Sequence, residues 1–183
     1  GLSSSTGANV SASPTSTTSY TVTGTDAGGC STTMAVVTVT IIPAPPLTVS
    51  ANTTICEGDS TSLTAGGANS YSWSPVGGLS NVTGSAVIAD PAVATTYTVT
   101  GIDANGCSNT TIVTVNIGIP AADAGINITI SQGESTLLTG SGGGTYLWSP
   151  AAGLNTVTGS TVTAGPNQTT TYYLVVTDAN GCT

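Results

Sequence analysis

The chain repeats itself with a period of about 75 to 77 residues, and this self-similarity limits the fold more than any other feature. The segment GLSSSTGANVSASPTSTTSYTVTGTDAGGCS from residue 1 matches GLSNVTGSAVIADPAVATTYTVTGIDANGCS from residue 78 without a gap. Stretches that begin at residues 53 and 70 match stretches from residues 128 and 145 at an offset of 75. A period of this size predicts a tandem array of small domains.

Short alternating runs of residues fill the repeat. Val, Ile, Thr and Tyr dominate these runs, while Gly, Pro, Asn and Asp separate them, and no run has helical period. Corresponding positions are apolar on alternate residues, as in strands with one buried face. The sequence therefore predicts an all-β fold with one immunoglobulin-like β-sandwich per repeat. In the complete repeat the expected strands span residues 46–51, 61–67, 69–75, 85–90, 95–102 and 107–117.

The comparison between repeats also predicts the core. Apolar or aromatic residues recur at the same strand positions, and recurring positions on one face are expected to be buried. The expected core residues are Val10, Val87, Val162, Ala12, Ala89, Ala164, Tyr20, Tyr97, Tyr172, Val22, Val99, Leu174, Leu63, Leu138, Trp73 and Trp148.

The phase of the repeat sets the expected domain boundaries. Residues 1–43 correspond to the C-terminal half of an immunoglobulin-like repeat, residues 44–120 to a complete repeat, and residues 121–183 to a repeat that lacks its last strand. We therefore expect a segment of a longer protein. Prolines stiffen the short linkers, so the units are expected to follow one another as a rod or filament.

Composition excludes several classes of function. The 183 residues include no Lys, Arg or His and eight carboxylates, which gives a net charge of −8. Nucleic acids and anionic lipids are bound by cationic side chains, which this chain lacks. No apolar run approaches the roughly 20 residues of a membrane span. We therefore expect neither nucleic acid as a partner nor membrane insertion. Without His or Lys there is no imidazole or amine base for a nucleophile, so we expect no enzyme and no cofactor, with a carboxylate-pair hydrolase as the remaining enzymatic alternative.

Four motifs at fixed spacing resemble a known type of repeat. They are CEGDSTSLTA at 56–65, YSWSPVGGL at 71–79, PAVATTYTVT at 91–100 and DANGC at 103–107. Together they resemble the Ig-like, PKD-like repeats of giant cell-surface proteins of Bacteroidetes-type bacteria. The resemblance implies an extracellular array of the kind that accompanies type IX secretion and gliding-motility adhesins. It implies little about a ligand, because adhesins, stalks and secreted hydrolases all carry such repeats.

The cysteines occupy two recurring positions. Cys56 opens the complete repeat and Cys107 follows its turn, and two cysteines in a small extracellular β domain most often form one disulfide. The resemblance implies the same Cys56–Cys107 pairing. Cys30 and Cys182 occupy the turn position of the other repeats, and Ser131 replaces the opening cysteine of the third. The partner of Cys30 is expected before residue 1, whereas Cys182 is either a free thiol or bonded to a neighbouring unit or chain.

The turn that contains DANGC also has a metal-binding interpretation. Asp103 and Asn105, or Glu57 and Asp59, offer two oxygens each to calcium, but no loop has the spacing of a dedicated site, and zinc would lack its N and S ligands. We therefore expect no metal. The simplest interpretation is a tight hairpin turn in which Asn-Gly supplies left-handed backbone and the Asp caps it.

The surface is predicted to carry glycans and to associate. Ser60, within Asp59-Ser60-Thr61, resembles the O-glycosylation acceptor of this bacterial group. Thr-rich strands without Lys leave sheet edges unprotected, so self-association is expected, and an incomplete sandwich would accept a strand from a neighbour. Candidate N-glycosylation sites follow the Asn-x-Ser/Thr pattern at Asn9, Asn52, Asn81, Asn109, Asn127 and Asn167.

Two functions of different kinds remain. The first is a structural segment of a long extracellular repeat protein that forms a cell-surface filament, stalk or adhesin shaft. The alternative is a carbohydrate- or surface-binding module of an adhesin or secreted hydrolase, with Tyr71, Trp73, Tyr146 and Trp148 as a sugar platform. Burial of Trp73 separates them, because a stalk hides this side chain and a platform exposes it.

Overall fold

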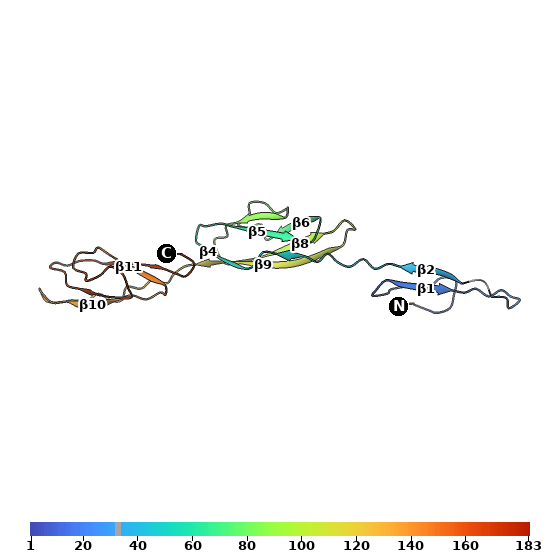
Figure 1. Cartoon of the computed structure of the whole chain (residues 1–183), viewed down its shortest axis with the longest axis horizontal. Coiled ribbons are helices and arrows are strands. Elements are labelled where there is room, and N and C mark those ends of the chain that lie inside the picture. Colours follow the sequence, from blue (N-terminus) through green and yellow to red (C-terminus); the bar gives the residue numbers. More distant parts are fainter. Residues whose placement is uncertain (32–33) are drawn as a thin grey trace.

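The computed structural model of the chain describes residues 1–31 and 34–183. Every helix or strand among these residues is a β-strand, which confirms the predicted all-β class. The described residues contain no helix of the length and hydropathy that a membrane crossing requires. Figure 1 shows three groups of strands that follow one another along the long axis of an elongated molecule.

The central group of strands is a sandwich of two sheets. One sheet has the order β3-β5-β7, and the other has the order β4-β9-β8-β6. All neighbours are antiparallel except β4 and β9, which are parallel. The strands are β3 (Thr48–Val49), β4 (Thr53–Cys56), β5 (Thr61–Gly66), β6 (Ser70–Ser74), β7 (Ala86–Ala89), β8 (Thr95–Ile102) and β9 (Ser108–Gly118).

The core of this sandwich consists of alternate residues from both sheets. The sequence comparison predicted most of these positions correctly, because β-branched and aromatic residues recur on the face that is buried. The residues are Leu63, Val87 and Ala89 from one sheet and Ile55, Trp73, Tyr97, Val99, Val113 and Val115 from the other.

Strand β4 is the element that the sequence analysis missed. Its four residues, TTIC, are too few to show a clear alternation. The strand pairs with β9 along one edge, with Thr53 opposite Val115 and Cys56 opposite Gly118. On its other edge β9 pairs with β8. This parallel pairing places Cys56 at the end of the sandwich where β9 finishes.

Each flanking group of strands contains smaller sheets. The N-terminal group pairs β1 (Thr18–Val22) with β2 (Ala35–Val39). The C-terminal group has two pairs, one of β10 (Thr136–Thr139) with β12 (Thr161–Ala164) and one of β11 (Thr145–Ser149) with β13 (Tyr173–Thr177). Each sheet lies within one of the segments 1–43, 44–120 and 121–183, whose boundaries stay predictions.

The flanking groups differ in how well they bury the predicted core positions. Trp148, Val162 and Ala164 are buried in the C-terminal group, like their counterparts in the central sandwich. Val10, in contrast, is 43% exposed and Val22 is 57% exposed. Their predicted burial is wrong for this structure, because the described residues of the N-terminal group provide no second sheet to cover them.

Candidate functional site: a disulfide-linked junction

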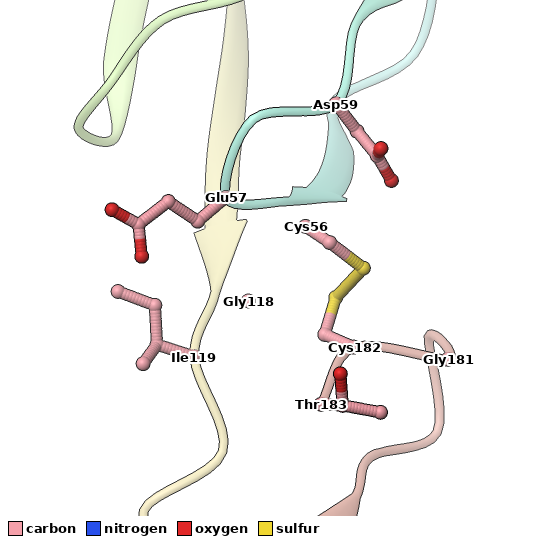
Figure 2. A pocket seen from close by; sticks show the side chains of 8 residues that line it. All are labelled: Cys56, Glu57, Asp59, Gly118, Ile119, Gly181, Cys182 and Thr183. Carbon is pink, nitrogen blue, oxygen red and sulfur yellow. A yellow bond between two sulfur atoms is a disulfide. The ribbon is translucent and has the colours of Figure 1, made fainter.

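A disulfide between Cys56 and Cys182 joins the central sandwich to the C-terminal group. The two Cα atoms are 5.1 Å apart, although 126 residues separate them in sequence. Cys56 is the last residue of β4, and Cys182 follows the turn after β13. Figure 2 shows the bond beside the end of β9, where the chain continues through Gly118 and Ile119. Of the two alternatives for Cys182, the structure therefore contains the bond to a neighbouring unit.

The predicted Cys56–Cys107 disulfide is wrong. Cys107 directly precedes the first residue of β9, whereas Cys56 lies opposite Gly118, the last residue of that strand. An extended strand rises about 3.3 Å per residue, so the 11 residues of β9 separate the two cysteines by roughly 35 Å. A disulfide requires Cα atoms within about 7 Å of each other. Cys107 therefore has a free, half-buried thiol, and Cys30 has a free, exposed one.

The turn that carries Cys182 is held by the carboxylate of Asp178. Its Oδ1 accepts hydrogen bonds from the backbone N–H groups of Asn180 at 2.8 Å and of Cys182 at 2.9 Å. The N–H of Asp178 in turn donates to the Cys182 carbonyl at 2.9 Å. These bonds fix the backbone of Cys182 and so aim its sulfur at the end of β4.

The same turn recurs in the other two repeats. Asp103 accepts from the N–H groups of Asn105 and Cys107 at 2.8 and 2.9 Å, and Asp26 makes the equivalent bonds. The predicted hairpin turn with an Asp cap is therefore confirmed. One detail was wrong: the left-handed residue is Gly106, with φ of 82°, and no residue other than glycine has a positive φ among the described residues.

These hydrogen bonds also affect the ionisation of Asp178. The backbone N–H of Cys182 is the largest cause that lowers the pKa of this carboxyl below 3.8, and the groups of Asn180 and Gly181 lower it further. Partial burial acts in the opposite direction. The carboxylate is thus charged at neutral pH, in the form that holds the turn.

Gly118 makes close approach of the two units possible. A Cβ at this position would stand 2.7 Å from the Sγ of Cys182 and 3.1 Å from Oδ2 of Asp178. Both distances are shorter than an ordinary van der Waals contact. Any larger residue at this position would therefore push the turn away from β9. Sequence reasoning missed this residue, and the available signal was a glycine directly after the alternating run of β9.

Acidic residues border the junction without converging on one point. A hollow of about 420 Å³ lies beside the disulfide and is lined by Glu57, Asp59 and Ile119 among others. The side chains of Glu57 and Asp59 point away from each other (Figure 2). Among the residues that the structure describes, no three His, Cys, Asp or Glu side chains lie close enough to hold a metal ion.

Of the four aromatic residues considered as a sugar platform, the two tryptophans are buried and the two tyrosines are half-buried. Trp73 is 3% exposed and donates its indole N–H to the Gly84 carbonyl at 2.9 Å. Trp148 is buried in the same way and donates to Gly159 at 3.0 Å. The hydroxyls of the neighbouring tyrosines bond to nearby backbone: that of Tyr71 to Ala68 and that of Tyr146 to Gly143. These four side chains therefore do not form an exposed platform.

The candidate glycosylation sites all lie on the surface. Ser60 and the six sequon asparagines are exposed. Asn109 differs from the others because its Nδ2 donates a hydrogen bond to the Pro45 carbonyl at 3.0 Å. Modification at Asn109 would place the glycan on the nitrogen that makes this contact between β9 and the preceding linker. Glycosylation stays a prediction at all seven positions.

No family model matches the chain, and no curated protein matches it. The interpretation of the junction therefore depends on its own geometry.

Proposed function

We propose that the chain is a structural, non-enzymatic segment of a long extracellular repeat protein that forms a cell-surface filament, stalk or adhesin shaft. One observation carries this proposal: the Cys56–Cys182 bond lies next to the polypeptide connection at Gly118. A single polypeptide connection, even a short one, still lets two domains bend and rotate relative to each other. A second covalent connection beside the first removes most of that freedom and favours a stiff rod.

Three further observations support the proposal. A disulfide is typical of proteins in oxidising, extracellular compartments. The burial of Trp73 and Trp148 favours a stalk over a sugar-binding module. The four sequence motifs resemble repeats of Bacteroidetes-type surface arrays, which supports a cell-surface location. Self-association and covalent glycans are parts of the same proposal.

Small-angle X-ray scattering of the full chain, with and without reductant, tests the proposed stiff junction. The oxidised chain is expected to give an elongated particle of one maximum dimension, and reduction is expected to broaden the distribution of dimensions. The double variant Cys56→Ser/Cys182→Ser should behave like the reduced chain under both conditions. The matched control Cys30→Ser/Cys107→Ser should behave like the oxidised parent. Identical scattering from oxidised and reduced chain would contradict the proposal.

A further inference from the structure

The outer face of the sheet β4-β9-β8-β6 carries a row of hydroxyl side chains that runs across the strands. Ser72 of β6 lies opposite Thr100 of β8, which in turn lies opposite Thr110 of β9. On its other side Ser72 is bridged to Thr83. Residues opposite each other in antiparallel strands point to the same face, so these four side chains form one hydroxyl row. Thr100 is half-buried, and the others are exposed.

The hydroxyls of this row have no hydrogen-bond partner within the described part of the chain. Other hydroxyls on the same face do have partners: those of Thr96 and Thr114 bond to each other at 2.9 Å. A hydroxyl is both a donor and an acceptor, so each member of the hydroxyl row must bond to water or to a ligand.

The fold of the repeat does not require hydroxyls at these positions. In the C-terminal group Leu147 takes the place of Ser72, and Val175 takes the place of Thr100. These two residues pair with each other, and Leu147 is bridged to Thr158, so the backbone arrangement is the same. Aliphatic side chains are therefore accepted at the same places, and the hydroxyl row is a property of the central sequence.

The face around the hydroxyl row offers nothing to an ionic or a sugar ligand. Strands β4, β6, β8 and β9 contain no charged residue, and the carboxylate that follows β8, Asp103, is engaged by its own turn. The aromatic rings of these strands pack into the core, so no ring is left for a sugar to stack on. The rows on either side are also uncharged and consist of Ser74, Thr98 and Ile112, and of Ser70, Ile102 and Ser108.

The spacing of the hydroxyl row matches the geometry of frozen water. Neighbouring strands of a sheet are about 4.8 Å apart. Two oxygens that bond to one common water at about 2.8 Å, with a tetrahedral angle between the bonds, are about 4.6 Å apart. Ice consists of such pairs, because every water in it bonds tetrahedrally to its neighbours. A water that bridges two adjacent hydroxyls of the row therefore has nearly the geometry that it has in ice.

We propose that the outer face of this sheet binds ice, with the hydroxyl row as the line of contact. This activity goes beyond the structural role, which a stalk without the row would fulfil equally well. The hydroxyls bond to waters of the ice surface, and the threonine methyl groups exclude disordered water between them. The sheet fixes the spacing before contact, so little conformational entropy is lost on binding. Charged side chains order water around themselves in other geometries, so an uncharged face suits this ligand.

Partition of the full chain into slowly growing ice tests the proposal. The crystal is washed and melted, and its protein content is compared with that of the remaining liquid. We expect the parent chain to be enriched in the ice relative to a non-binding protein of similar size and charge. Thr100→Tyr places a ring in the middle of the hydroxyl row, and Tyr is a good strand former, so the fold should persist. Its enrichment should fall at least about fivefold, because the ring displaces the bridging waters without replacing their hydrogen bonds.

Thr64→Tyr is the matched control, because Thr64 is an exposed strand residue on the outer face of the other sheet. This variant should be enriched in ice like the parent, and chemical unfolding checks that both variants keep the sandwich. Thr110→Val removes one hydroxyl of the row at nearly constant shape and should also lower the enrichment, even if Thr100→Tyr does not fold. A parent chain that stays in the liquid, or equal losses from Thr100→Tyr and Thr64→Tyr, would overturn the proposal.

Sedimentation in the liquid separates ice binding from contact between copies. Ice binding predicts that the parent chain and Thr100→Tyr sediment alike above the freezing point. If Thr100→Tyr instead dissociates an assembly of the parent, the face is an interface between copies, and the proposal is overturned. Neither measurement depends on the Cys56–Cys182 bond, so redox-dependent scattering that persists in that case would leave the proposed stiff junction intact.

Discussion

The sulfur of Cys182 lies against Gly118, 2.7 Å from the point where a Cβ of that glycine would stand. Cys182 belongs to the turn after β13, and Gly118 is the last residue of β9. The two units therefore meet at a glycine, which has no side chain to keep them apart. Because Cys56 is opposite Gly118 in the sheet, the same glycine leaves room for the disulfide.

Replacement of Gly118 by Ala should weaken the junction. The added methyl group must displace the Cys182 turn, and overpacking of this kind costs about 1–3 kcal/mol. We expect a larger fraction of Cys56 and Cys182 thiols to react with an alkylating reagent under partly reducing conditions, as measured by mass spectrometry. Gly77→Ala is the control, since a Cβ there meets no atom within 4 Å. Equal labelling of the two variants would contradict the role given to Gly118.

Removal of the Cys107 thiol should have almost no effect. The side chain is half-buried and unbonded, so Cys107→Ser is expected to change the free energy of unfolding by less than about 0.5 kcal/mol. Peptide mapping without reduction should still recover the fragment that joins Cys56 to Cys182. A peptide that joins Cys56 to Cys107 in the parent chain would instead show that the disulfide forms within one unit.

Acid should loosen the turn at Cys182. The folded pKa of Asp178 lies below its ordinary value of 3.8, because the N–H of Cys182 bonds to the charged form. The carboxylate therefore contributes stability above that value, and the contribution is lost as pH falls through the folded pKa. The amide resonances of Asn180 and Cys182 should titrate with a midpoint below 3.8.

Asp178→Asn provides the comparison for this titration, because the side-chain amide cannot ionise. The amide resonances of Asn180 and Cys182 in this variant should therefore not titrate over the same pH range. In the control variant Asp59→Asn, in which the substitution lies outside the turn, the Cys182 amide resonance should titrate as it does in the parent. A parent midpoint above the ordinary value would contradict the assignment.

Truncation of Trp73 should destabilise the central sandwich strongly. The side chain is almost completely buried, so Trp73→Ala is expected to cost about 3–5 kcal/mol in chemical unfolding. Ile112→Ala is the matched control on the outer face, since Ile112 is 61% exposed, and it should stay within about 0.5 kcal/mol of the parent. Rapid quenching of Trp73 fluorescence by acrylamide would show an exposed ring and favour the sugar platform.

The sequence was most informative where repeats could be compared. Val87 and Val162 occupy the same strand position in two repeats, and so do the two tryptophans. All four side chains are buried. The comparison failed for Val10, because burial depends on a second sheet and not only on the pattern of one strand. A recurring apolar position thus predicts which face is turned inward, but not whether that face is covered.

The disulfide could not be derived from the sequence for a different reason. The spacing of Cys56 and Cys107 suggests a pair within one unit, but β4 and its parallel register place them at opposite ends of β9. That register is a long-range contact of a strand too short to recognise. The role of Gly118 is likewise visible only once the next unit is in place.

The parallel pairing of β4 with β9 also determines how the molecule responds to tension. A pull on the C-terminal group reaches the central sandwich at two adjacent strand ends, Gly118 through the backbone and Cys56 through sulfur. Both strands are then loaded in the same direction, so neither is peeled from the sheet alone. A protease that cuts the polypeptide between Ile119 and Gly181 leaves the two pieces tied together. The disulfide therefore keeps the two units covalently connected even after the polypeptide between them has been cut.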